Sequence, residues 1–192
     1  MKRLNKSKGY TVIELLIAVF ITGVLAAAGF KFYIGMHNQA LAQEEISDMQ
    51  QNSRNTLDEI AKNLRKAGYK LDTTHVPFRV NGDSLYIFFS ETQAVDTVLY
   101  YLASYPDSQS SVWLGQLERA EMPKILMRKV NGNYPEIFSE LVKDITFTVL
   151  GSSTVEVLIE VQTSKADEDF ASNRGFRTYT ALESVNIRNL AF

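Results

Sequence analysis

The sequence contains no cysteine, which excludes disulfide bonds, thiol nucleophiles and zinc sites built from thiolates. Only four prolines occur among the 192 residues, and the first of them is Pro77. Proline inside a helix removes a backbone hydrogen bond, so its absence before this point permits a long uninterrupted helix. Glycine is also absent between Gly35 and Gly68. The N-terminal third of the chain can therefore be helical almost throughout.

The chain also lacks an excess of basic residues, since its formal net charge is −2. Four of the twenty Lys and Arg residues precede residue 9, namely Lys2, Arg3, Lys6 and Lys8. The remaining sixteen are outnumbered by the 22 Asp and Glu residues, so the rest of the chain carries a net charge of −6. A mildly acidic body is a poor nucleic-acid surface, and we expect no nucleic-acid partner.

Motifs that carry catalysis are absent as well. The sequence has no G-x-S-x-G, no P-loop and no H-E-x-x-H, and its two histidines, His37 and His75, stand apart from other candidate groups. We therefore expect no enzyme activity and no cofactor. One acidic cluster, Asp167, Glu168 and Asp169, offers carboxylate oxygens to calcium but lacks the alternating spacing of an EF-hand loop. A solvated run of charges is the alternative interpretation.

A long apolar run, Val12 to Phe30, follows the basic residues directly. A basic segment before an apolar one is typical of an export signal, with the basic side in the cytoplasm. Two interpretations compete: a signal peptide cleaved after Ala26-Ala27-Ala28, and a retained membrane anchor from Tyr10 to about Met36. Glu14 fits neither, because a carboxylate deep in a bilayer costs about 2.5–3.5 kcal/mol on insertion scales. Either this segment never spans a membrane, or Glu14 has a partner.

Helical periodicity continues beyond the apolar run. One face carries Ile46, Met49, Ser53, Leu57, Ile60, Leu64 and Ala67, at spacings of three or four residues. The opposite face carries Glu44, Glu45, Asp48, Arg54, Asp58 and Lys62. Gly68 is a natural C-terminal stop. The sequence thus predicts a helix from Tyr10 to Ala67, on the order of 85 Å long, with an apolar half followed by an amphipathic half.

From Tyr69 onward, short apolar segments alternate with turn signals. The predicted strands are Ser84–Ser90, Val95–Leu102, Lys124–Val130, Ile145–Leu150, Val155–Val161, Phe176–Leu182 and Ser184–Arg188. Trp113, between two of them, is expected in the core. An antiparallel sheet packed on the second half of the helix, an α+β arrangement, is the expected fold.

The stretch Gly9-Tyr10-Thr11-Val12-Ile13-Glu14 resembles the processing site of type IV prepilins: a glycine, an aromatic residue and, four residues later, a carboxylate. The resemblance implies that a membrane peptidase cuts between Gly9 and Tyr10 on the cytoplasmic side and methylates the new amino group of Tyr10. It assigns Glu14, with Thr11, to subunit register, the carboxylate lying opposite the amine of a neighbouring subunit. A positive charge in a dry filament core needs such a partner.

Other stretches indicate which type IV prepilin-like proteins the chain resembles. "RNTLDEIAKNLRKAGYK", residues 54–70, and the order "VLYYL … ILMRKVNG … LVKDITFTV … VNIRN" resemble PilW-type minor pilins and the related J-type pseudopilins. The helix departs from many major pilins in having no kinking proline. The resemblance implies a minor pilin that helps to initiate pilus assembly near the tip. A pseudopilin of a type II secretion system is the alternative, and an exported soluble binding protein with a cleaved signal peptide is a third.

The predicted organisation is a cleaved leader at 1–9, a membrane or filament-core helix at 10–36, an amphipathic helix at 37–68 and a sheet domain at 69–192. The resemblance implies other minor and major pilins and the prepilin peptidase as partners. It places the chain in the inner membrane, with its C-terminal domain in the periplasm. Assembly then moves it into a pilus on the cell surface or a periplasmic pseudopilus.

Overall fold

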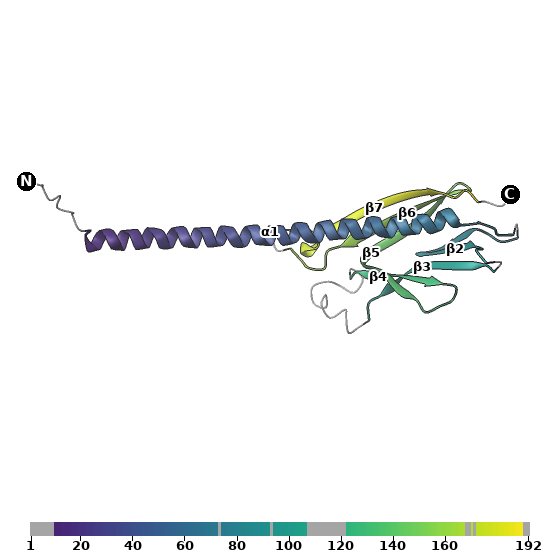
Figure 1. The fold of residues 1–192 in the computed structure, drawn as a ribbon, viewed down its shortest axis with the longest axis horizontal. Coiled ribbons are helices and arrows are strands. Elements are labelled where there is room, and N and C mark those ends of the chain that lie inside the picture. Colours follow the sequence, from purple (N-terminus) through teal and green to yellow (C-terminus); the bar gives the residue numbers. More distant parts are fainter. Residues whose placement is uncertain are drawn as a thin grey trace, which may run out of the picture. The chain divides into compact units, whose positions relative to one another are not determined.

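A computed structural model describes residues 10–72, 74–92, 94–106, 122–167, 170 and 172–189 (Figure 1). It contains one long helix, α1 (Val12–Lys66), and a short 3₁₀-helix, η1 (Ser172–Gly175). The strands are β1 (Phe78–Asn81), β2 (Ser84–Phe89), β3 (Asp96–Ser104), β4 (Lys124–Val130), β5 (Glu136–Leu150), β6 (Thr154–Gln162) and β7 (Thr178–Asn186). Trp113 lies outside the described residues.

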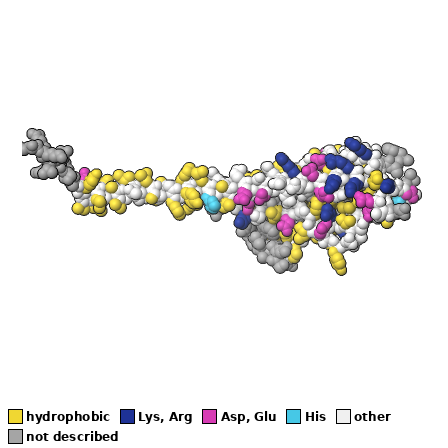
Figure 2. All heavy atoms as spheres, viewed as in Figure 1, with side chains coloured by type: hydrophobic (Ala, Val, Ile, Leu, Met, Phe, Trp, Pro, Cys, Tyr) yellow, Lys and Arg dark blue, Asp and Glu magenta, His cyan; other side chains and the backbone are white. Residues whose placement is uncertain are grey.

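The chain divides between Glu44 and Glu45 into two compact units. The described part of the first unit is the N-terminal portion of α1, and its large apolar side chains are exposed along its whole length (Figure 2). Phe20 and Phe32, for example, expose 72% and 70% of their surfaces. By length and composition α1 can cross a membrane, and its apolar window is not buried against the rest of the described chain. These side chains need lipid or other helices to cover them.

The second unit contains the rest of α1 and an antiparallel sheet of seven strands. The strands lie in chain order, β1 to β7, so every neighbour in sequence is also a neighbour in space (Figure 1). Strict alternation marks β2 and β6, whose inward side chains include Leu85, Ile87, Val157 and Ile159. The α+β, pilin-like arrangement expected from the sequence is confirmed.

The core of this unit lies between one face of α1 and the inner face of the sheet. Ile60 and Leu64 are fully buried there, as the periodicity predicts, and Met49 packs at the margin. A buried hydrogen bond joins α1 to the sheet, in which Asn63 Nδ2 donates to the Tyr100 hydroxyl over 2.7 Å. Burial raises the pKa of Tyr100, so this hydroxyl stays protonated at neutral pH.

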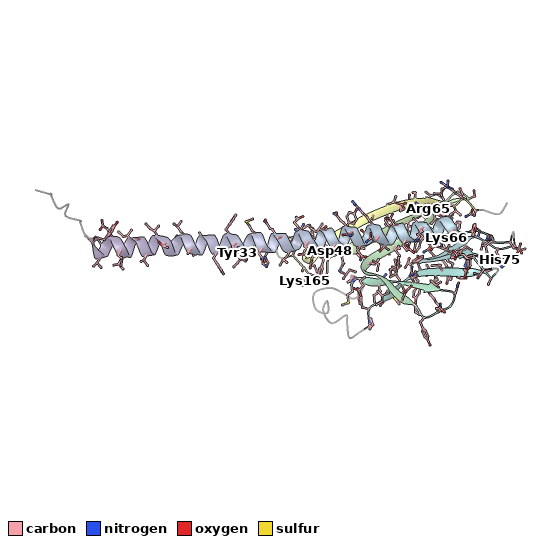
Figure 3. The ribbon with its side chains drawn as sticks, in the orientation of Figure 1. Tyr33, Asp48, Arg65, Lys66, His75 and Lys165 are labelled. Atoms are coloured by element: carbon pink, nitrogen blue, oxygen red, sulfur yellow. The ribbon has the colours of Figure 1, made fainter. Side chains whose placement is uncertain are left out.

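The helix ends where the sequence predicts. The Ala67 N–H donates to the Leu64 carbonyl, and Gly68 follows with φ of 78°. Only glycine adopts this backbone conformation without strain. A β-carbon on Gly68 would also overlap the Asn189 carbonyl. Arg65 and Lys66, labelled in Figure 3, lie in this last turn.

Three strand predictions need correction. β1 was missed because four residues after Pro77 are too few for a periodic signal. The two short strands predicted at 176–182 and 184–188 are one strand, β7. Glu183 lies on the less exposed face of β7, together with buried Ala181 and Val185. Its carboxylate forms an ion pair with Arg65 at 3.5 Å. The alternation therefore looks broken in the sequence, although the strand continues.

β5 is the third correction, since it starts at Glu136 and not at Ile145. Its buried residues Ser139, Val142 and Ile145 are three positions apart, because bulges interrupt the pairing on both sides of β5. At one of them Leu141 has φ of 58°, a left-handed conformation that is rare for leucine. A period of three resembles neither a regular strand nor a helix.

Candidate functional site

The first turn of α1 is closed by two side chains three residues apart. The Thr11 backbone N–H donates to Glu14 Oε2 over 2.8 Å, and the Thr11 hydroxyl donates to the same oxygen over 3.0 Å. In return, the Glu14 backbone N–H donates to Thr11 Oγ1 over 3.3 Å. This is a capping box, in which a threonine and a glutamate satisfy backbone donors that the helix leaves unpaired. The T-x-x-E spacing signals such a box in the sequence, and the box fixes the start of the helix.

The capping box holds the one charged side chain between Val12 and Phe30. A carboxylate in the first turn interacts favourably with the positive end of the helix dipole. Both hydrogen bonds from Thr11 go to Oε2, and among the described residues no bond to Oε1 occurs. The adjacent Ile13 and Leu15 are exposed and apolar. The helix terminus thus presents a negative charge on an apolar surface, where a cation from another molecule can pair with it.

The predicted cleavage site borders the described chain. Tyr10 is its first residue and is 91% exposed, one residue before the capping box. Gly9 and the rest of the predicted leader lie outside the described residues. Cleavage between Gly9 and Tyr10, and methylation of Tyr10, stay predictions.

The acidic cluster considered for calcium is only partly described, because Glu168 and Asp169 lie outside the described residues. Asp167 Oδ2 accepts hydrogen bonds from Arg177 Nη2 at 2.7 Å and Nε at 3.0 Å. Arg177 also lies over the Phe170 ring. The described residues therefore give Asp167 a structural role in its loop, and within them no group of three metal-binding side chains forms.

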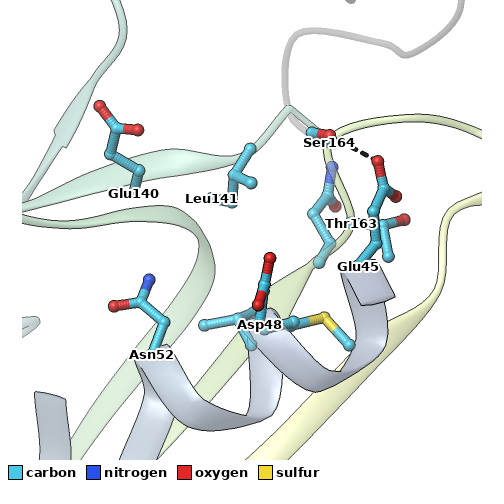
Figure 4. Close-up of a pocket in the computed structure, with 10 residues that line it drawn as sticks. Glu45, Asp48, Asn52, Glu140, Leu141, Thr163 and Ser164 are labelled. Atoms are coloured by element: carbon cyan, nitrogen blue, oxygen red, sulfur yellow. Dashed lines mark hydrogen bonds between the residues drawn. The ribbon is translucent and has the colours of Figure 1, made fainter. Parts of the chain in front are cut away.

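Sequence reasoning missed a pocket of about 210 Å³ in the second unit, hereafter the acidic pocket. Residues of α1, β5 and the end of β6 line it, including the carboxylates Glu45, Asp48 and Glu140 (Figure 4). Its lining residues include no Lys, Arg or His. The charged face of α1 predicts Glu45 and Asp48 as exposed acids, but only the fold brings Glu140 beside them.

Comparison with protein families gives one match over residues 4–30, to the prokaryotic N-terminal methylation motif. No curated protein and no solved structure shows significant similarity to the chain. The match includes Gly9, Tyr10 and Glu14, and it continues through most of the apolar run. Such a motif implies processing by a prepilin peptidase, an inner-membrane anchor before assembly, and assembly with other pilins. Together with the long apolar helix and the curled antiparallel sheet, this match fits a type IV prepilin-like protein and supports a pilin or a pseudopilin.

Proposed function

We propose that this chain is a minor pilin of the PilW type, a structural subunit that helps to initiate assembly of a type IV pilus. One observation carries the proposal: a capped carboxylate stands at the start of a helix whose apolar side chains have no cover within the described chain. Such a helix is stable only among other apolar helices or in lipid. The ends of those helices must then also satisfy the charge on Glu14.

The partner of Glu14 arises by processing. Hydrolysis of the Gly9–Tyr10 peptide bond removes residues 1–9 and frees the α-amine of Tyr10, which stays cationic after one methyl group is added. The motif match supports this processing, and the amine lies four residues before Glu14. In a filament core the amine of one subunit meets the Glu14 carboxylate of its neighbour, and the pair sets the axial register. The attraction between the two charges offsets part of the cost of removing them from water.

In this proposal residues 10–36 form the anchor and filament core, residues 37–68 carry the sheet, and residues 69–192 form the periplasmic domain. The positive residues of the leader keep the N-terminus in the cytoplasm before cleavage. Because Glu14 needs the amine of another subunit, the chain sits just below the outermost tip subunit and in low copy number. Other minor pilins complete the priming complex.

A pseudopilin of a type II secretion system has the same helix and the same capped carboxylate, so it is the second candidate. Deleting the gene in its source bacterium and restoring it on a plasmid distinguishes the two. Loss of surface pili in electron micrographs, with protein secretion intact, supports the minor pilin. Loss of secretion with pili intact supports the pseudopilin.

Processing is tested on protein recovered from the cell envelope. The intact mass should match a chain that begins at Tyr10 and carries one added methyl group. A chain that begins at Gly29 would instead support the exported soluble protein with a cleaved signal peptide.

A further inference from the structure

The acidic pocket has polar groups that nothing in the described chain satisfies. Gln162, at the end of β6, lines it and is only 2% exposed. Its Nε2 atom is buried and has no hydrogen-bond partner among the described residues. A buried donor without an acceptor is unfavourable, and native proteins contain few of them. An acceptor from outside the described residues that reaches this amide would remove the cost.

The carboxylates of the pocket indicate that a ligand bound there carries a positive charge. Asp48 and Glu140 are exposed, and neither forms an ion pair or a hydrogen bond within the described residues. Glu45 accepts a hydrogen bond from the Ser164 hydroxyl over 3.1 Å (Figure 4). Because no Lys, Arg or His lines the pocket, its three carboxylates favour a positively charged ligand.

The remaining lining residues favour a basic side chain over a metal ion as the ligand of the pocket. Met49, Leu141 and Val161 give the pocket an apolar surface, which suits the alkyl stem of lysine or arginine and not a hydrated ion. Among the described residues the carboxylates do not converge into a group that can hold a metal. The Gln162 amide nitrogen needs an acceptor oxygen, and a bare cation has none, whereas a peptide has its carbonyls.

We propose that the acidic pocket binds a lysine or arginine side chain together with an adjacent backbone carbonyl, both from a neighbouring subunit. The cationic head meets Asp48 and Glu140, the stem covers the apolar surface, and the carbonyl accepts from Gln162 Nε2. That the segment comes from a neighbouring subunit rests on the proposed function. The recognition of a basic peptide does not, and it is tested without any assembly.

The test uses the full chain in detergent micelles, ¹⁵N-labelled and observed by NMR. The probes are N-acetyl-lysine-N-methylamide and its arginine counterpart. N-acetyl-norleucine-N-methylamide lacks the charge, and butylamine lacks the carbonyls. We expect at least one basic probe to shift the Gln162 side-chain amide and the Thr163 and Ser164 backbone amides saturably. The norleucine probe and butylamine should bind at least about tenfold more weakly.

Matched variants locate the site. Asp48→Asn should weaken the basic probe at least about tenfold, whereas Asp58→Asn, an exposed acid on the same helix but outside the pocket, should not. Gln162→Leu should remove the difference between the lysine probe and butylamine, with thermal unfolding as the check that it folds. No saturable shift with either basic probe, or equal binding to wild type and Asp48→Asn, overturns the proposal. So does saturation of the same resonances by calcium alone.

A negative result in the probe titration is distinguishable from failure of the proposed function. The probe titration does not depend on Glu14, on cleavage after Gly9 or on a filament. A chain that assembles into pili but ignores the basic probes would keep the minor-pilin proposal and remove the pocket. A chain that binds the probes but never enters a filament would keep the pocket proposal and remove the minor-pilin proposal.

Discussion

The Glu14 carboxylate is held by Thr11 at the start of α1, so it has a local role in addition to the proposed pairing with a neighbouring amine. The two roles differ in what they require. A capping box accepts glutamine as well as glutamate, because either side chain offers an oxygen to the backbone N–H. Pairing with a cationic amine requires the negative charge.

Glu14→Gln should therefore keep the helix start but prevent incorporation. Removing one partner of a buried ion pair costs about 3–5 kcal/mol, because the other charge stays buried and unpaired. We expect the variant to be cleaved and to fold, while its amount in purified filaments falls nearly to zero by immunoblot.

Thr11→Ser is the matched control, since serine keeps the capping hydroxyl. It should enter filaments as the wild type does. If Glu14→Gln is incorporated normally and Thr11→Val is not, helix capping is the role of this site and the pairing with an amine is wrong.

Asp96, at the start of β3, joins two turns. Its Oδ2 accepts from the Glu91 backbone N–H over 3.0 Å, and its Oδ1 accepts from Asn131 Nδ2 over 2.7 Å. These bonds favour the ionised form, the one from Glu91 most, and hold the pKa of Asp96 below its usual value. A carboxyl whose folded pKa is depressed stabilises the fold above its unfolded pKa. That stabilisation is lost as the pH falls through the folded pKa.

Asp96→Asn should accordingly lower the thermal midpoint at pH 7, and the difference from wild type should shrink as the pH falls below about 4. Thermal unfolding followed by circular dichroism in a non-ionic detergent measures both. A difference that is constant between pH 7 and pH 3 would mean that the charge on Asp96 contributes nothing.

At the scale of elements, the two parts of α1 differ in how their apolar side chains are buried. Up to Glu44 its large apolar residues are exposed, whereas from Glu45 onward one face packs on the sheet. Ile60 and Leu64 are fully buried on that face, and Asp58 and Lys62 are exposed on the other. The amphipathic half therefore supplies one side of the hydrophobic core, and its sequence is constrained by packing.

Ile60→Ala should lower the free energy of unfolding of the domain by about 2–5 kcal/mol, through lost burial and the cavity that remains. Asp58→Ala on the exposed face should change it by no more than about 0.5 kcal/mol. Urea unfolding followed by circular dichroism gives both values. Equal effects would mean that this face of α1 does not pack on the sheet.

At the scale of the whole molecule, the two units contribute differently to folding. Every residue of the main core cluster, including those packed at its margin, lies at or beyond Met49. Within the described part of the chain, removing the residues up to 36 takes away no core side chain and no strand. The sheet and its supporting helix should therefore fold without the apolar segment.

A chain that begins at His37 should be soluble and should unfold cooperatively, with a mixed helix and sheet spectrum by circular dichroism. Its thermal midpoint should lie close to that of the full chain in detergent. A truncated chain that shows no cooperative transition would mean that the apolar segment is needed for the domain to fold.

The sequence alone determined the long helix, its change from apolar to amphipathic, and the N-terminal motif. These are local or periodic features: Thr11 and Glu14 are three residues apart, and the buried face repeats every three or four residues. Most strands could be predicted for the same reason, since alternation in β2 and β6 is unbroken.

The tertiary structure alone decided the features that join distant residues. The bulge at Leu141 breaks the alternation in the first half of β5, so the sequence does not show this part as a strand. The ion pair between Arg65 and Glu183 accounts for the charged residue that interrupts the alternation of β7. The acidic pocket brings together Asp48, Glu140 and Gln162, which are far apart in the chain. No local pattern encodes such a juxtaposition, because strand pairing and helix packing set it only when the sheet closes over α1.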